Sequence, residues 1–179
     1  MNDILRGATP FVVVTKSVIG CHEELPETTG TIRGNAIQKA QYLFDKYGVD
    51  CFSEDTGLEI DALDGEPGVD TAFYSGSRDA VKNMTFVLEK MGNTTHRTAR
   101  FRTVIALILR GSLHTFEGVC EGVIRTEISN GTEGFGYDPL FQPEGYDLTF
   151  AELNSEVKNQ ISHRARATYA LLAFLKKDF

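Results

Sequence analysis

The stretch RFRTVIALIL, residues 100–109, is followed across Gly111 and Ser112 by HTFEGVCEGVI, residues 114–124. Both stretches are rich in β-branched, aliphatic and aromatic residues, and the glycine between them favours a tight turn, so together they predict a long β-hairpin. The first arm is apolar at consecutive positions rather than at alternate ones. A strand of that kind is buried on both faces, which predicts a central place in a sheet.

Helical and extended segments alternate on either side of this hairpin. Residues 31–47 place apolar side chains at helical spacing before Gly48, and residues 79–91 predict a second helix. Ser155 and Ser162 are candidate N-caps of a short helix and of a longer C-terminal one. Further strands are predicted at 11–15 (FVVVT), 49–53 and 58–63. The alternation predicts an α/β fold with a mixed sheet.

Composition narrows the class of protein. A chain of 179 residues, 41% hydrophobic and 24% charged, is typical of one globular domain spanning residues 1–179. It has no apolar run of membrane-spanning length and no secretory signal pattern. Its three scattered cysteines indicate reduced thiols and a cytoplasmic location. The net charge of −7 argues against broad nucleic-acid binding, which requires a positive field.

The segment CFSEDTGLEIDALDGEPG, residues 51–68, carries two adjacent acids, Glu54 and Asp55, at a predicted turn before Gly57. Adjacent carboxylates repel each other, and a site that keeps them usually offers a cation or a proton in return. The alternative is an Asx-type turn in which Asp55 bonds its own backbone near Gly57. The residues alone leave both interpretations open.

The segment NGTEGFGYDP, residues 130–139, combines flexible glycines, two aromatic residues and a carboxylate. Gly136 and its neighbouring glycine permit close approach to a ligand. Phe135 and Tyr137 offer faces on which a flat ring can stack, and Asp138 offers a hydrogen-bond acceptor. The alternative is a hairpin-like turn with aromatic residues that belong to the core.

Two further segments carry charged residues around predicted helix starts. In SEVKNQISHRARA, residues 155–167, basic side chains stand where the helix dipole disfavours them, which suggests an acceptor-rich partner; a solvated helix face is the alternative. In CHEELPETTGTIRGNAIQKA, residues 21–40, Glu27 could join Asp55 around a metal and Lys39 could meet phosphate oxygens. The alternative there is that acids ahead of a helix simply stabilise its N-terminus.

Six segments, taken together and in order, resemble the inosine/xanthosine triphosphate pyrophosphatase family. They are PET…GNAIQKA, EDTGLEIDALDGEPG, FEGVCEGVI, GTEGFGYDPLF, TFAEL and EVKNQISHRARA. The resemblance runs from about Val18 to the C-terminus, and the pairing of FGYDP with K…ISHR is specific. It implies hydrolysis of ITP, dITP and XTP to the monophosphate and pyrophosphate with Mg²⁺, by a homodimer. It also implies an elongated mixed β-sheet with flanking helices, in two lobes around a central nucleotide cleft.

The resemblance also implies roles for individual residues. Asp55 matches the acid that helps to hold Mg²⁺ and activates water, and Glu27 matches a second metal-associated carboxylate. Glu54, next to Asp55, is expected in the acidic corner of the same metal–phosphate site. The other matches concern the substrate. They are the phosphate contacts Lys39 and Lys158, the hydroxyl of Thr56, and a base pocket of Phe135, Gly136, Tyr137, Asp138, His163 and Arg164.

The chain departs from the family pattern in several places. The family begins with a strand and a phosphate-binding loop that this sequence lacks, so we expect an N-terminally truncated domain. Such a domain should have an exposed apolar groove and unpaired strand edges. We also expect it to be less stable and to bind phosphate more weakly. The family usually has a Glu just before the pair Asn35–Ala36, where this chain has Arg33 and Gly34. Phe73 replaces an Arg of the family pattern, and Glu133 replaces a Gly.

Three functional hypotheses remain open from the sequence. The first is an active pyrophosphatase for non-canonical purine triphosphates. The second is a catalytically impaired remnant that binds purine nucleotide or only dimerises. The third is a related pyrophosphatase with a shifted base preference, such as for modified pyrimidines, against which the intact FGYD and SHR motifs weigh.

Overall fold

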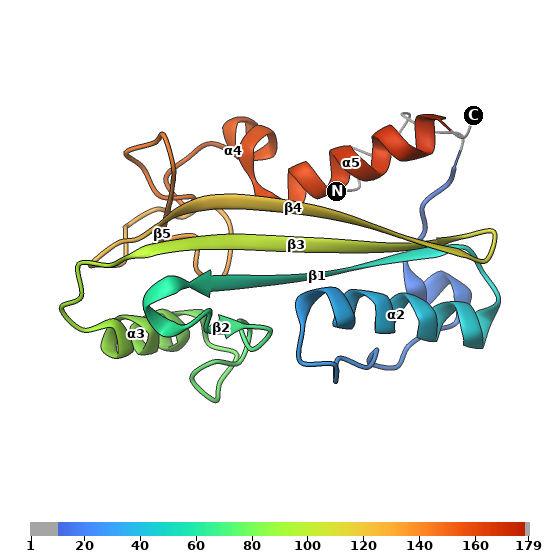
Figure 1. Ribbon diagram of the computed structural model, residues 1–179, viewed down its shortest axis with the longest axis horizontal. Helices are drawn as coiled ribbons and strands as arrows, with labels where there is room; N and C mark the ends of the chain where they lie inside the picture. The colour runs from blue at the N-terminus through green and yellow to red at the C-terminus, as the bar shows by residue number, and fades with distance from the viewer. Residues whose placement is uncertain (1–10, 178–179) are drawn as a thin grey trace. The chain divides into compact units, whose positions relative to one another are not determined.

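The computed structural model describes residues 11–177, which form an open antiparallel sheet in the order β2-β1-β3-β4-β5, flanked by helices (Figure 1). The strands are β1 (Cys51–Ile60), β2 (Pro67–Gly68), β3 (Thr98–Leu109), β4 (Ser112–Ile124) and β5 (Phe141–Pro143). The helices are α2 (Ile32–Tyr47), α3 (Ala80–Met91), α4 (Ser155–Ile161) and α5 (His163–Lys177), with 3-10 turns η1 (Lys16–Ile19) and η2 (Asp61–Leu63). The α/β class is confirmed, and the described part of the expected mixed sheet is antiparallel.

The chain divides into two compact units. Unit 1 contains the described residues of Met1–Asp55, Thr103–Gly118 and Arg164–Phe179, and unit 2 contains Thr56–Arg102 and Val119–His163. Each unit has a hydrophobic cluster of its own. Between residues 11 and 177, none of the helices has the length and apolarity needed to cross a membrane.

In unit 1, α2 packs against the first half of β1. The helix begins where the Thr31 side chain accepts a hydrogen bond from the Gly34 N–H (3.0 Å) and ends at Gly48, whose φ of 64° is a left-handed cap. The contact with β1 includes hydrogen bonds from Ser53 Oγ to the Ala36 carbonyl (2.5 Å) and from Cys51 Sγ to a carbonyl one turn further on (3.4 Å). The predicted helix at 31–47 is confirmed.

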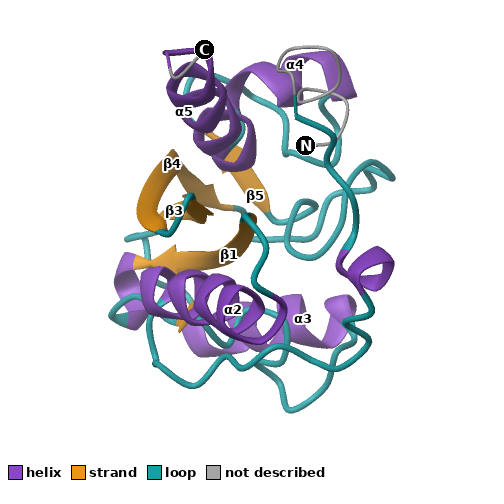
Figure 2. Cartoon of the chain, turned by 90° about the vertical axis from the view of Figure 1, so that its right-hand side faces the viewer, coloured by secondary structure: helices purple, strands orange, loops and turns teal. Residues whose placement is uncertain are grey.

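Helix α5 packs against the second half of β3 in the same unit. The cluster joins Ile105, Leu107 and Leu109 of β3 to Leu171 and Leu175 of α5, all buried. Figures 1 and 2 both show α2 and α5 on opposite faces of the strands. Because β3 is covered in this way and lies between β1 and β4, its predicted central position is confirmed.

The β3–β4 hairpin is also confirmed. Arg110 (φ 51°) and Gly111 (φ 78°) are its two linking residues, and a two-residue turn with positive φ at both positions matches the twist of the flanking strands. At α4 the cap is one residue earlier than predicted. Asn154, not Ser155, accepts the hydrogen bond from Val157 N.

In unit 2, aromatic and aliphatic side chains from many segments form one core. Phe101 lies at its centre, in edge contact with Phe141 (ring centroids 4.8 Å apart) and stacked with Phe150 at 6.0 Å. Leu58 and Ile60 of β1 and three side chains of α3 complete the same cluster. This core supports the loop 130–139 discussed below.

One predicted strand is wrong. Residues 11–15 belong to no strand of the described sheet, and Val12 is 87% exposed. A β-branched sequence favours the pleated conformation, yet a strand exists only where a neighbouring strand pairs with it. Propensity alone could not establish that partner.

The predicted turn at Glu54–Gly57 is wrong as well. The predicted strands at 49–53 and 58–63 are one continuous strand, β1, that passes through both acids. The Asx-turn interpretation of Asp55 is therefore wrong too. Successive side chains of a strand point to opposite faces of a sheet, so Glu54 and Asp55 are separated by the backbone and do not share one corner.

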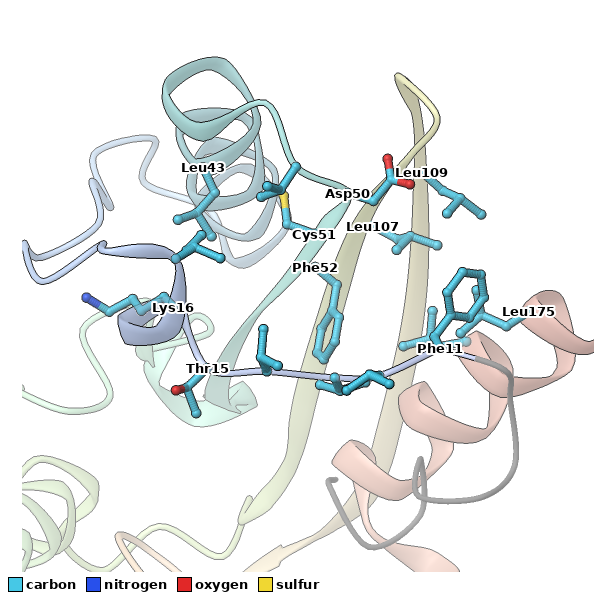
Figure 3. A pocket seen from close by; sticks show the side chains of 16 residues that line it. Phe11, Thr15, Lys16, Leu43, Asp50, Cys51, Phe52, Leu107, Leu109 and Leu175 are labelled. Carbon is cyan, nitrogen blue, oxygen red and sulfur yellow. The ribbon is translucent and has the colours of Figure 1, made fainter.

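The apolar groove expected from the sequence is present in unit 1. It is a pocket of about 340 Å³ between residues 11–15, strands β1 and β3 and helices α2 and α5 (Figure 3). Its walls are mostly apolar, among them Phe52, Leu107 and Leu175.

We expect the Cys51 thiol to be unreactive in the folded chain. Burial raises the pKa of Cys51 from 9.0 to about 11, which lowers its thiolate fraction at pH 8 by about 100-fold. Iodoacetamide labelling, mapped by mass spectrometry, should therefore be about 100-fold slower at Cys51 in the native chain than in urea. Since the folded-state pKa lies above the unfolded one, this thiol stabilises the fold below pH 9, and the contribution is lost as pH rises through about 11. Equal labelling rates with and without urea would contradict this assignment.

Candidate active site

The predicted residues of unit 1 gather around Lys39. This lysine lies on the inner face of α2 and is 8% exposed. Its Nζ donates one hydrogen bond to Asp55 Oδ1 (2.8 Å) and a second to Glu27 Oε1. Asp55 is also mostly buried, with a side-chain exposure of 13%, whereas Glu27 is about half exposed. The structure therefore brings Lys39 together with Glu27, 12 positions before it in the sequence, and with Asp55, 16 positions after it.

The protonation of this cluster is set by burial and by its internal hydrogen bonds. Burial raises the pKa of Asp55, and this effect outweighs the opposing hydrogen bond from Lys39. Burial alone would lower the pKa of Lys39, but its hydrogen bonds to Asp55 and Glu27 outweigh that effect and raise it. Lys39 therefore stays charged at neutral pH, and a cation that enters the cluster must compete with it for the two carboxylates.

Glu54 lies on the opposite face of β1 from Asp55. Its carboxylate pairs with the guanidinium of Arg164, at the start of α5, through Nη2–Oε1 (2.9 Å) and Nε–Oε2 (3.2 Å) contacts. Two parallel contacts of this kind fix both side chains. Strand alternation thus sends one acid toward α2 and the other toward α5, which explains how adjacent carboxylates are tolerated.

In unit 2, Asp138 organises the glycine-rich loop. Asp138 is 4% exposed, and its Oδ2 accepts hydrogen bonds from Phe135 N (2.9 Å) and from Lys158 Nζ (2.5 Å). Gly134 has a φ of 83°, and a Cβ there would lie 2.0 Å from Asp138 Oδ2. The loop therefore closes tightly around one carboxylate and one ammonium group.

The two aromatic residues of the loop have different environments. Phe135 is 65% exposed, and the Lys158 Nζ lies 5.9 Å from its ring centroid. Tyr137 is buried in the core, where its hydroxyl donates to the Thr71 carbonyl (2.9 Å) and burial raises its pKa. Of the two faces predicted for stacking, only that of Phe135 is exposed, and Tyr137 fits the alternative of a core aromatic.

The remaining predicted residues occupy separate places. His163 is buried and stacks on Phe101, with centroids 4.6 Å apart and an interplanar angle of 15°. Thr56 follows Asp55 on β1 and is half-buried, and Gly136 has a φ of 62° within the loop. Their roles toward substrate stay predictions.

Neither the residue patterns nor the family resemblance gives a role to Asn35 or Thr29. The Asn35 side chain is buried, and its Oδ1 accepts hydrogen bonds from Thr29 N and Thr29 Oγ1. A polar residue on the buried face of α2, one turn before Lys39, was the available signal, because residues i and i+4 lie side by side on a helix.

The donor set limits the kind of metal site. Within residues 11–177, no three His, Cys, Asp or Glu side chains are grouped so that they could hold a metal by themselves. Mg²⁺ keeps several waters and is usually held by one or two carboxylates together with substrate phosphates. Glu27 and Asp55, linked through one lysine, fit an ion of that kind.

Known proteins resemble this chain over nearly its whole length. The dITP/XTP pyrophosphatase of Flavobacterium johnsoniae is 52% identical over 166 residues, which are 92% of this chain and 86% of that protein. The dITP/XTP pyrophosphatase of Porphyromonas gingivalis is 49% identical over 177 residues, 98% of this chain and 90% of that one. These relatives carry the name of an acid-anhydride hydrolase, the enzyme class that the motifs predict.

Solved structures agree with the sequence matches. A HAM1 protein from Coxiella burnetii superposes with a TM-score of 0.91 at 32% identity, covering 98% of this chain and 91% of that one. The Ham1 protein of Staphylococcus aureus gives a TM-score of 0.85 at 38% identity, covering 88% and 83%. The sequence pattern of the Ham1 family matches residues 1–174, and the chain belongs to this family.

Proposed function

We propose that the chain is a nucleoside triphosphate pyrophosphatase that hydrolyses dITP, XTP and ITP to the monophosphate and pyrophosphate. The observation that carries this proposal is the Glu27–Lys39–Asp55 cluster, in which two carboxylates and a lysine meet on α2 and β1. Membership of a family with relatives named dITP/XTP pyrophosphatase supports the substrate class. The three free cysteines support a cytoplasmic location.

We assign the phosphate chemistry to the residues of unit 1. Glu27 and Asp55 would hold Mg²⁺, which supplies positive charge to the phosphates when bound. Asp55 accepts the proton of the attacking water, and Lys39 neutralises phosphate oxygens. Because Glu54 is paired with Arg164 on the other face of β1, we assign it to the placement of Arg164 rather than to the metal.

We assign base recognition in unit 2 to the loop around Asp138 and to His163. The exposed ring of Phe135 offers a stacking face to a purine. Lys158, which the motif match gives to the phosphates, is bound to Asp138, so we propose that it holds the loop in place. A homodimer, as the family resemblance implies, is part of the same proposal.

Pyrophosphate release by this chain tests the proposal directly. We expect release from dITP, XTP and ITP with Mg²⁺, none with a chelator, and far slower release from ATP, because a 6-amino group replaces the 6-oxo acceptor. Light scattering of the protein as it elutes from a size-exclusion column measures its oligomeric state. A folded chain that is stabilised by nucleotide but shows no turnover would favour the catalytically impaired remnant. Faster turnover of modified dUTP than of ITP would favour the shifted base preference.

A further inference from the structure

Tyr137 joins the glycine-rich loop 130–139 to a second loop of unit 2. Its ring lies in the hydrophobic core, and the residue is 2% exposed. Its hydroxyl donates a hydrogen bond to the Thr71 carbonyl (2.9 Å), 66 positions earlier in the sequence. A carbonyl can only accept, so the phenol must be the donor. Replacement of Tyr137 by phenylalanine therefore removes this contact and keeps the ring.

The segment that accepts this bond, residues 66–76, is fastened to the sheet through Thr71. The Thr71 Oγ1 accepts a hydrogen bond from the backbone N–H of Leu58 in β1 (2.9 Å). The same hydroxyl donates to the Gly68 carbonyl (2.6 Å). Both bonds of the side chain fix the residue whose carbonyl receives the Tyr137 proton.

Helix α3 holds the same segment through Asn83. This residue is 3% exposed, its Oδ1 accepts a hydrogen bond from Ser75 N (2.8 Å), and its Nδ2 donates to the Ala72 carbonyl (3.2 Å). A buried amide that is bonded at both ends makes its surroundings rigid. Residues 66–76 are therefore a fixed support for the Tyr137 hydroxyl.

On the other side of the bond, Tyr137 is part of the turn that presents Phe135. The Asp138 N–H donates to the Phe135 carbonyl (3.3 Å), which closes a turn over residues 135–138. The Asp138 Oδ2 accepts a hydrogen bond from Phe135 N (2.9 Å) within the same turn. Tyr137 is the third residue of this turn, so a bond from its side chain to a fixed segment holds the turn as a whole.

We propose that Tyr137 is a positioning residue that holds the turn 135–138 closed by tethering it to residues 66–76. This inference rests on the proposed function, which assigns the stacking of the base to Phe135. A ligand that requires one arrangement of a loop binds more weakly in proportion as that arrangement is less populated. The tether therefore acts on the binding of the base and not on the phosphate chemistry assigned to unit 1.

Tyr74 provides a matched control in the same segment. Its ring packs against the same core, and its hydroxyl donates to Glu66 Oε2 (2.5 Å). Tyr137→Phe and Tyr74→Phe therefore each remove one phenol hydroxyl that bonds residues 66–76. Only the first removes the bond between the two loops.

The test compares these two variants with the wild-type chain by hydrogen–deuterium exchange of residues 130–138 and by steady-state kinetics with dITP. We expect this segment to exchange about 3- to 10-fold faster in Tyr137→Phe, as loss of one hydrogen bond produces. KM for dITP should rise by the same factor, with kcat within about twofold of the wild type. Tyr74→Phe should keep the exchange rate and KM within about twofold.

Thermal unfolding separates the tether from a general loss of stability. Both variants should lower the melting temperature by a similar amount, about 2–4 °C, so a rise in KM confined to Tyr137→Phe cannot come from lost stability. Should Tyr137→Phe fail to fold, Thr71→Val, which removes the hydroxyl that fixes the acceptor, should raise exchange and KM in the same way. Thr71→Ser keeps that hydroxyl and should restore both.

The inference fails if Tyr137→Phe keeps the wild-type exchange rate, because burial of the ring alone would then hold the turn. It also fails if Tyr74→Phe changes exchange and KM as much, or if faster exchange leaves KM unchanged. A wild-type chain without turnover would overturn the proposed function but not the tether, which is then decided by exchange alone. Faster exchange in Tyr137→Phe than in Tyr74→Phe supports the tether, and equal exchange in both overturns it.

Discussion

Asp55→Asn should lower kcat for pyrophosphate release from dITP by about 10³-fold or more. The carboxamide cannot take a proton from water and carries no charge for a divalent cation, so both assigned roles are lost together. The fold should survive, because Lys39 keeps its hydrogen bond to Glu27 and the carboxamide oxygen can still accept from Lys39. Replacing one charged hydrogen bond in this mostly buried cluster by a weaker neutral one costs about 1–3 kcal/mol. Pyrophosphate detection, together with thermal unfolding, measures both effects.

Asp45→Asn is the matched control for this experiment. Asp45 is an exposed acid on α2 that accepts a hydrogen bond from Gln41 (2.7 Å), so its replacement changes the net charge by the same amount. We expect its kcat to stay within about twofold of the wild type. Equal losses in the two variants would mean that the charge of the chain, and not the buried cluster, governs the rate.

Much of the fold could be predicted from residue patterns. The helix at α2 followed from apolar residues at helical spacing and a glycine stop, and the hairpin followed from two β-rich arms around Gly111. These features depend on interactions within a few residues, which local sequence encodes directly. Family membership followed from the motifs and is confirmed by the match over residues 1–174.

The predictions that were wrong or incomplete concerned residues whose structural partners are distant in sequence. Residues 11–15 have strand-forming side chains but no place in the described sheet, and pairing is a property of the whole fold. Glu54 and Asp55 were interpreted as neighbours at a turn, although a continuous strand separates them to opposite faces. Asn35 was missed because its hydrogen bonds from Thr29 form only once the preceding loop has folded against α2.

Gly134→Ala should raise KM for dITP by about tenfold or more. The new Cβ would lie 2.0 Å from Asp138 Oδ2 and 2.5 Å from Lys158 Nζ, so the carboxylate and the ammonium cannot both stay in place. Asp138 would then lose its hold on Phe135 N, and the exposed ring would no longer be presented in one orientation. Binding that depends on a fixed stacking face and a closed loop is lost with it. Steady-state kinetics and direct titration with dIMP, the product, measure the change.

Gly145→Ala separates this clash from backbone strain. Gly145 also has a φ of 83°, but a Cβ there meets nothing within 4 Å. Both variants force alanine into the left-handed region, at a cost of about 1–2 kcal/mol, so both should unfold at lower temperature. Only Gly134→Ala adds the collision with Asp138 and Lys158. If the two variants bind dIMP equally well, the loop around Asp138 does not recognise the base, and the recognition must be sought elsewhere in the chain.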